Sequence, residues 1–129
     1  MIRTFDTGAT RDDNEGKHNY SGFLSPTVIE RYGRYMHNHR LQSDGNLRAA
    51  DNWKRGIPKH EYLESAWRHL LDWWAIHEKT PVREHDVEEA LCALMFNTMG
   101  YLHEVLKEKG EIEQAVRSMS KHATHFHGM

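Results

Sequence analysis

Residues 59–77 read KHEYLESAWRHLLDWWAIH, and this stretch decides the fold because its side chains repeat with a helical period. Its charged side chains recur at spacings of three and four and fall on one narrow stripe: Glu61, Glu64, Arg68 and Asp72. Its large apolar side chains form a wide surface that we expect to be buried: Leu63, Ala66, Trp67, Leu70, Leu71 and Trp74. The charged stripe should therefore border the core.

A second long helix is expected from about residue 83 to 109, where Gly110 is a natural stop. One of its faces is broad and apolar: Val87, Leu91, Leu94, Met95, Met99, Leu102 and Leu106. Another face combines small and polar residues and leaves space: Asp86, Glu89, Ala90, Ala93, Asn97, Gly100 and Glu104. The short connection around Pro81 implies that the two helices pack antiparallel.

The rest of the chain completes an all-α bundle in a single domain, residues 1–129. Residues 1–24 show neither helical nor strand periodicity, so they form an irregular arm. Ser25 and Pro26 favour a helix start, and the helix should reach about Leu41. A long loop, 42–59, precedes the central helix pair, and loops of this length are usually functional or disordered. Residues 110–129 predict a short helix, 111–122, and a tail containing His125 and His127.

Composition limits the function classes. The chain has 129 residues, 38% of them hydrophobic, and a mean hydropathy of -0.83, so one subunit has a modest core and oligomerisation would help. A net charge of -2 gives no reason to expect binding to nucleic acid or to an anionic membrane. The single cysteine, Cys92, suits a reducing compartment, and no apolar run approaches the ~20 residues of a membrane helix. We therefore expect a soluble cytoplasmic protein.

The two charged faces suggest a metal-dependent chemistry. If the helices pack antiparallel, the stripe at 61–72 faces Asp86, Glu89 and Asn97 across a cleft. Carboxylates crowded in such a cleft repel one another unless cations are bound, and Mg²⁺ or Mn²⁺ prefers oxygen ligands that also bridge to phosphates. Hydrolysis of a phosphate ester or phosphoanhydride, with a metal-bound water as nucleophile, follows from this arrangement.

Several ordered landmarks resemble the phage dATP/dGTP diphosphohydrolase family. They are Asn52-Trp53-Lys54-Arg55-Gly56-Ile57-Pro58, then Ser65-Ala66-Trp67-Arg68-His69-Leu70, then Asn97, preceded by Gly8-Ala9-Thr10-Arg11-Asp12 and Gly16-Lys17. The resemblance covers about residues 6–104. It implies a relationship to the all-α MazG-like nucleotide pyrophosphohydrolases, which are helical oligomers that cleave nucleoside triphosphates to monophosphate and pyrophosphate with Mg²⁺ or Mn²⁺. A dimer or tetramer that acts on purine deoxynucleoside triphosphates in the cytoplasm of a phage-infected host is the expectation.

The expected metal ligands are Glu61, Glu64, Asp86 and Glu89. The superfamily pattern places two carboxylates three apart on one helix and a Glu and an Asp three apart on the next. Glu61 and Glu64 match the first pair and Glu89 the next Glu, but Cys92 stands where the final Asp is expected. Asp86 and Glu89 have the same separation in reverse order. Acids in the first turn of a helix are also favoured by the helix dipole alone.

The substrate-binding residues expected beside these ligands are Lys17, Asn52, Trp53, Lys54, Arg68, His69 and Asn97. Arg68 and Lys54 would neutralise the departing pyrophosphate. The expected catalytic residues are Glu61, Glu64, Arg68 and Glu89. Each has a structural alternative. Arg68 could pair with Asp72, Trp53 could anchor the loop, and Asn97 could bond a helix backbone.

The departure at Cys92 motivates a different class of function. A non-catalytic nucleotide-binding protein would keep the cleft, sequester a nucleotide or a nucleotide-derived signal, and need little divalent metal. A helical interaction protein whose acidic stripe is only solvated surface is a third option.

Overall fold

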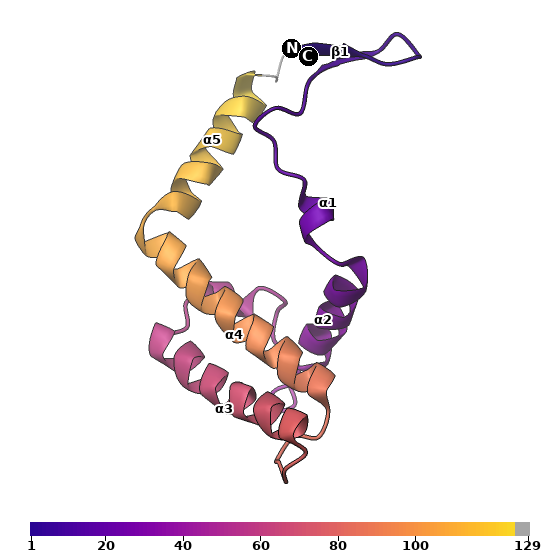
Figure 1. Cartoon of the computed structure of the whole chain (residues 1–129). Helices are drawn as coiled ribbons and strands as arrows, with labels where there is room; N and C mark the ends of the chain where they lie inside the picture. The colour runs from indigo at the N-terminus through magenta and orange to yellow at the C-terminus, as the bar shows by residue number, and fades with distance from the viewer. Residues whose placement is uncertain (126–129) are drawn as a thin grey trace. The chain divides into compact units, whose positions relative to one another are not determined.

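The computed structural model describes residues 1–125, apart from the side chains at 112, 113 and 121–125. Most of these residues are helical, which confirms the predicted all-α class (Figure 1). The elements are β1 (Ile2–Thr4), β2 (Thr10–Asp12), α1 (Tyr20–Phe23), α2 (Pro26–Asn38), the 3-10 helix η1 (Asn52–Arg55), α3 (Lys59–Glu78), α4 (Val87–Glu108) and α5 (Glu111–His125). The last helix reaches His125, beyond the expected end at 122, so the predicted tail is wrong for His125, while His127 lies outside the described residues. The chain divides into two compact units, Met1–Arg31 and the residues from Tyr32 onward.

The first unit contains a small antiparallel hairpin and one helical turn. β1 pairs with β2 in the register Ile2↔Asp12, and Gly8, with φ 90°, lies in the turn between the strands. The side chain of Asn19 caps α1 by accepting a hydrogen bond from the Gly22 amide at 3.1 Å. The prediction of an irregular arm at 1–24 is therefore wrong in part. These elements are held by turn and cap chemistry and are too short to show a period.

Helix α2 begins as its sequence predicts. The Ser25 hydroxyl accepts a hydrogen bond from the Val28 amide at 3.3 Å, and Pro26 occupies the first helical position. The helix ends at Asn38, three residues before the expected end at Leu41. Beyond it the chain turns back on itself, with an isolated bridge between Leu41 and Leu47. The segment after α2 is thus a structured turn that leads into η1.

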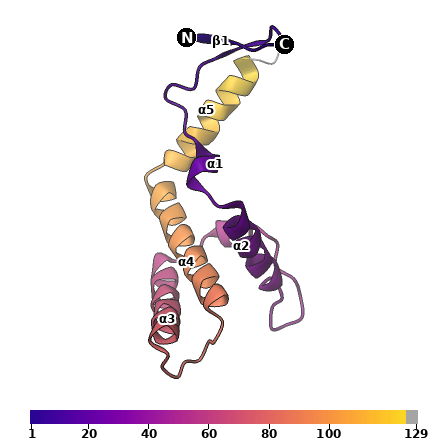
Figure 2. The ribbon, with the colours of Figure 1, turned by 45° about the vertical axis from the view of Figure 1, so that its right-hand side comes forward.

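Helices α3 and α4 form the antiparallel pair that the sequence predicts, and both views show them side by side (Figures 1 and 2). Lys59, at the start of α3, donates a hydrogen bond to Glu108, at the end of α4, with Nζ and Oε2 2.9 Å apart. Helix α3 ends at Glu78 and is C-capped by Lys79, whose φ of 58° places it in the left-handed region. Helix α4 begins at Val87 and is N-capped by Asp86, whose carboxylate accepts a hydrogen bond from the Glu88 amide at 2.9 Å.

The contact between α3 and α4 depends on the small residues of α4. Ala90, Ala93, Asn97 and Gly100 are buried, as expected for one face of this helix. The missing side chain at Gly100 leaves space for the ring of Tyr62, which is 2% exposed. A Cβ at Gly100 would lie 2.3 Å from Tyr62 Cε1, so no larger residue fits there without a shift. Gly100 therefore makes room for a side chain of the protein itself, whereas Ala90, Ala93 and Asn97 of the same face line pockets.

The expected burial of the apolar surface of α3 is wrong for the single chain. Its large side chains are 37–60% exposed: Leu63, Trp67, Leu70, Leu71 and Trp74. The reason is geometric, because α4 packs on the side of α3 that carries Tyr62 and His69. At about 100° per residue, positions 63, 67, 70 and 74 point roughly 80–140° away from Tyr62. The side of α3 that packs instead carries the buried carboxylate of Asp72.

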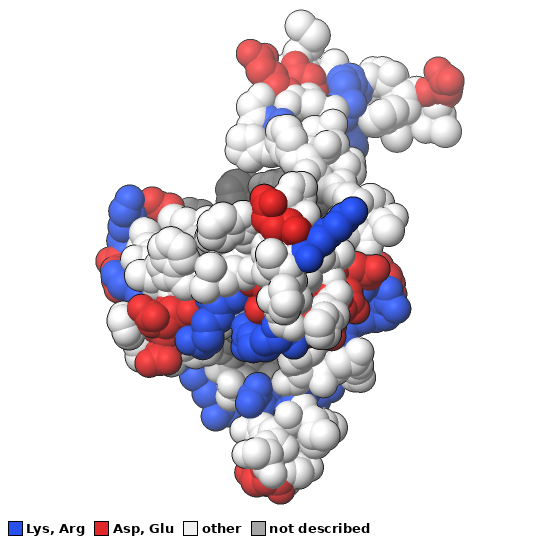
Figure 3. Space-filling view, turned by 60° about the horizontal axis from the view of Figure 1, so that its bottom comes forward, with Lys and Arg blue, Asp and Glu red and all other residues white. Residues whose placement is uncertain are grey.

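The surface carries charges of both signs. On the face shown in the space-filling view, Lys and Arg side chains lie beside Asp and Glu side chains, and several Lys and Arg side chains gather in its lower middle part (Figure 3). Within residues 1–125, no helix combines the length and the apolar character needed to cross a membrane.

Candidate functional site

Two pockets lie in the second unit, between the end of α2, the loop that contains η1, and the helix pair. The larger has a volume of about 660 Å³, which is in the range of roughly 300–1,000 Å³ typical of small-molecule sites. The smaller has a volume of about 110 Å³. Tyr35, His39 and His69 line both, so the two spaces adjoin. Together they form the candidate site.

Aromatic side chains form one wall of the larger pocket. Trp53 packs edge-on against His103 and Phe96 of α4, with ring centroids 4.8 and 6.4 Å apart. Tyr35 and His39 lie ring against ring at 4.0 Å. Trp53 thus anchors the loop to α4 and lines the pocket at the same time. An aromatic wall of this kind can stack against a planar ligand.

Basic residues form another part of the larger pocket. Arg40, Arg48 and His37 line it, and none of the described residues along its wall is an Asp or a Glu. The arginines also brace the loop, because Arg40 Nε donates to the Arg48 carbonyl at 2.7 Å and Arg48 Nη1 donates to the His39 carbonyl at 3.3 Å. The braced guanidinium groups keep further N–H donors for an anion. This pocket suits a ligand that is both aromatic and negatively charged.

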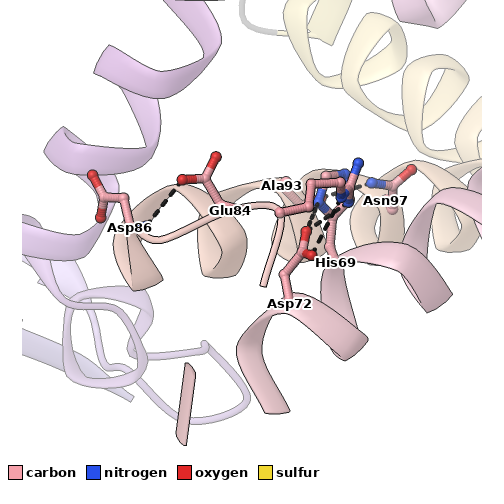
Figure 4. Close-up of polar contacts among 7 residues, drawn as sticks. His69, Asp72, Glu84, Asp86, Ala93 and Asn97 are labelled. Atoms are coloured by element: carbon pink, nitrogen blue, oxygen red, sulfur yellow. Dashed lines mark hydrogen bonds and ion pairs between the residues drawn. The ribbon is translucent and has the colours of Figure 1, made fainter. Parts of the chain in front are cut away.

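The smaller pocket is acidic and is lined by Asp72, Glu84 and Glu89. Asp72 is buried and accepts two hydrogen bonds from Arg83, from Nη2 at 2.6 Å and from Nε at 3.3 Å. Figure 4 shows Asp72 pointing toward His69, while Glu84 and Asp86 lie to one side of this group. Glu84 accepts from the Asp86 amide at 2.9 Å. The smaller pocket therefore adds carboxylates beside the basic and aromatic one.

His69 stands where the two pockets meet. Burial lowers its pKa, and the neighbouring Arg83 guanidinium lowers it further. The Asp72 carboxylate, 3.7 Å from Nδ1, acts in the opposite direction but does not outweigh these two effects. His69 is therefore neutral at pH 7 and contacts Asp72 as an uncharged imidazole.

Tyr35 is the other titratable group shared by the pockets. Burial raises the pKa of Tyr35 to about 12, and the charge of Glu89 adds to this effect. The phenol thus stays protonated at neutral pH and keeps an O–H donor. The His39 ring nitrogen Nδ1 lies 2.8 Å from the Tyr35 carbonyl, which can only accept, so Nδ1 carries a proton and donates it to this hydrogen bond.

The structure places part of the predicted substrate-binding set in the larger pocket. Asn52, Trp53, His69 and Asn97 line it. Lys54 lies beside it, with Nζ 5.7 Å from the centre of the Trp53 ring. Lys17 belongs to the first unit. Asn97 also makes the alternative contact, a hydrogen bond to the helix backbone, because its amide donates to the Ala93 carbonyl at 2.7 Å.

The predicted metal ligands are spread over the surface of the helix pair. Glu61, Glu64 and Arg68 are exposed on α3 and line neither pocket. Asp86 caps α4, and Glu89 lines the smaller pocket. In the part of the chain that the structure describes, no three Asp, Glu, His or Cys side chains are grouped so that they could hold a metal ion. The expected convergence of the four carboxylates is therefore not observed.

Asp72 does not make the ion pair with Arg68 that was the structural alternative for Arg68. Asp72 pairs with Arg83, which lies in the connection between α3 and α4. The spacing of four within one helix made Arg68 the natural candidate, but Asp72 points toward the pocket whereas Arg68 is exposed. A partner from a loop cannot be found from helical spacing.

Five residues that line the larger pocket were not expected from the sequence: Tyr35, His37, His39, Arg40 and Arg48. A signal was present, because four basic or imidazole side chains occur within residues 37–48, at the end of one helix and the start of a long loop. Their assembly into one wall depends on the turn at 39–48 and could not be read from spacing.

The chain was compared with protein families and with known proteins. No family model matches it, and neither the curated proteins nor the solved structures contain a significant match.

Proposed function

We propose that this protein is a nucleoside triphosphate pyrophosphohydrolase that converts purine deoxynucleoside triphosphates to monophosphate and pyrophosphate with Mg²⁺ or Mn²⁺. One observation carries the proposal: an aromatic and basic pocket of about 660 Å³ shares Tyr35, His39 and His69 with an acidic one. A nucleotide needs an aromatic surface for its base and positive charge for its phosphates, and a phosphate-bound cation needs carboxylates nearby.

In this proposal the larger pocket binds the nucleotide. The base stacks on the aromatic wall around Trp53, and Arg40 and Arg48 neutralise phosphate oxygens. Tyr35 donates a hydrogen bond through a phenol that stays protonated, because its pKa is raised to about 12. His69 remains neutral and can hold a hydrogen bond between the two pockets. The substrate class comes from the resemblance at residues 52–70 to phage dATP/dGTP diphosphohydrolases.

The carboxylates fit a cation that arrives with the phosphates better than one held by protein alone. No preformed cluster of three ligands exists among the described residues. Mg²⁺, however, is commonly bound by one or two carboxylates together with substrate phosphates and water. Glu84 and Glu89 line the smaller pocket and would be those carboxylates. The bound ion would lower the pKa of a water and neutralise phosphate charge.

A second function has an observation in its favour. The predicted ligands Glu61 and Glu64 lie outside both pockets, and the buried carboxylate of Asp72 is already paired with Arg83. Without a sufficient metal site, the protein would bind the nucleotide and not hydrolyse it. This is the sequestration function that the Cys92 departure suggested.

Product analysis separates the two functions. Purified protein is incubated with the four deoxynucleoside triphosphates and the four ribonucleoside triphosphates in Mn²⁺, and products are separated by chromatography. Monophosphate and pyrophosphate from dATP or dGTP, abolished by chelation, would support the pyrophosphohydrolase. Intact nucleotide that co-elutes with the protein would support sequestration. If the protein shows neither hydrolysis nor co-elution, both functions are overturned.

Variants then test the site itself. Glu89→Gln and Glu84→Gln should lower turnover by at least about 100-fold, because each removes a negative oxygen ligand from the acidic pocket. Glu78→Gln, at the exposed end of α3, is the matched control and should leave turnover unchanged. If both pocket variants turn over dATP and dGTP at the wild-type rate, the smaller pocket is not the catalytic site.

A further inference from the structure

One side of α3 remains apolar and exposed along most of the helix. We define the outer face of α3 as Leu63, Trp67, Leu70, Leu71 and Trp74, whose exposures are 47, 55, 37, 51 and 60%. A hollow of about 260 Å³ lies at its C-terminal end, lined by Leu70, Trp73, Trp74 and His77. None of these residues lines the two pockets of the candidate site. The outer face therefore needs an explanation of its own.

The size of this face argues against a solvent-exposed surface. With roughly 200 Å² for each large side chain, the exposed fractions leave on the order of 500 Å² of apolar surface on one helix. The largest apolar patch on a typical monomer is about 300–600 Å² and is often functional. A standard interface buries about 800 Å² per partner, and in homodimers about 65% of it is apolar, which is again on the order of 500 Å².

The arrangement of the residues indicates which partner fits. A two-fold axis applies the same face to both copies, so the face must be complementary to itself when it is reversed. Reversing α3 about a point between Arg68 and His69 places each tryptophan opposite a leucine. Trp67 then faces Leu70 of the second copy, and Trp74 faces Leu63. Large and small apolar side chains alternate across the contact, as close packing requires.

Charge at the ends of the face fits the same arrangement. His60 borders the outer face near the start of α3 and Glu78 near its end. In an antiparallel pair, His60 of one copy lies beside Glu78 of the other, and the contact occurs twice. The two helix dipoles also run in opposite directions, which favours antiparallel over parallel pairing.

We infer that the outer face of α3 binds the outer face of α3 of a second copy of this chain, antiparallel, with Trp67 packed on Leu70 and Trp74 on Leu63. The few buried apolar residues support this pairing: in the described part of one chain, the buried hydrophobic residues are Tyr62, Ala90, Cys92 and Ala93. A pair of α3–α4 hairpins would bury the surface that one hairpin leaves in water. This inference does not depend on the proposed function.

Oligomeric state tests the inference directly. The full-length chain, of 15.2 kDa, should have twice this mass in sedimentation or light scattering at micromolar concentration. Trp67→Glu should give a folded monomer, because it places two carboxylates in the contact. Met119→Glu, at an exposed apolar residue of α5, is the matched control and should remain dimeric. Circular dichroism checks that each variant keeps its helices.

Disulfide trapping tests the direction of pairing. Mixing Leu63→Cys protein with Trp74→Cys protein should give a cross-linked dimer under mild oxidation, whereas each variant alone should not. The native Cys92 is buried and should not compete. A wild-type monomer at all concentrations, or a dimer that survives Trp67→Glu, would overturn the inference. Cross-linking of either variant with itself would overturn the antiparallel arrangement.

Discussion

The two sides of α3 differ in a way that reverses the usual rule for a helix. The side that packs against α4 and the pockets carries Tyr62, Ser65, His69 and Asp72, whereas the outer face carries leucine and tryptophan. Asp72 is 4% exposed and Trp74 is 60% exposed. Apolar residues normally face inward because burial of their surface stabilises the fold. This distribution is what the proposed ligand site on one side of α3 and the inferred second copy on the other side require.

The largest effect should come from the packed side. Tyr62→Ala should lower the free energy of unfolding by about 3–5 kcal/mol, because it leaves a cavity between α3 and Gly100 of α4. Leu63→Ala, one residue away on the outer face, should cost less than about 1 kcal/mol. Both are measured by urea denaturation in the monomeric Trp67→Glu background. If the two variants lose the same free energy of unfolding, the packed side of α3 contributes no more to stability than its outer face, which contradicts the prediction.

A smaller loss should follow removal of the partner of Asp72. Arg83→Ala should cost about 2 kcal/mol at pH 7, because it leaves a buried carboxylate without its two-point hydrogen bond. The arginine side chain is itself 59% exposed, so its desolvation contributes little to the stability change on substitution. Arg55→Ala, at an exposed residue of η1, should change stability by no more than about 0.5 kcal/mol. Thermal unfolding of the three proteins gives the comparison.

Acid should weaken the packed side through His69. Its pKa is lowered in the folded state, mainly by burial, so the unfolded chain binds the proton more readily than the folded one. Stability should therefore fall as the pH drops below the ordinary histidine value of 6.5, and the loss should level off below the folded pKa. His69→Gln should lose less stability over this range. If the variant and the wild type lose the same free energy of unfolding over this pH range, burial of His69 does not contribute to the acid sensitivity.

The smallest effect concerns a single hydroxyl. The Tyr62 O–H is buried and has no hydrogen-bond partner, and burial raises its pKa. Tyr62→Phe should therefore change the free energy of unfolding by less than about 1 kcal/mol and could increase it, since it removes a polar group that gains nothing from burial. A clear loss of stability in urea denaturation would show that this hydroxyl is bonded in solution.

Much of the fold could be predicted because local rules specify it. The start of α2 at Ser25 and Pro26, the antiparallel pairing of α3 with α4, and the small face at Ala93 and Gly100 all follow from capping, loop length and helical spacing. The hairpin at 1–12 could not be predicted, because three residues per strand are too few to show alternation.

The candidate site was less predictable. Trp53, His69 and Asn97 were expected and line the larger pocket. Arg48 reaches the same pocket from a turn of the loop, and Arg83 reaches Asp72 from the connection between two helices. Such contacts join residues that no period relates, so only the folded chain brings them together.

The sequence by itself determined that this chain is helical, which residues share each face of α3 and α4, and that these helices run antiparallel. These features depend on spacing, capping and loop length, which act over a few residues. Only the tertiary structure decided which face of α3 is inside. Helical spacing gives the angle between Tyr62 and Trp67 but not the direction of α4, and the fit of the Tyr62 ring over Gly100 sets that direction.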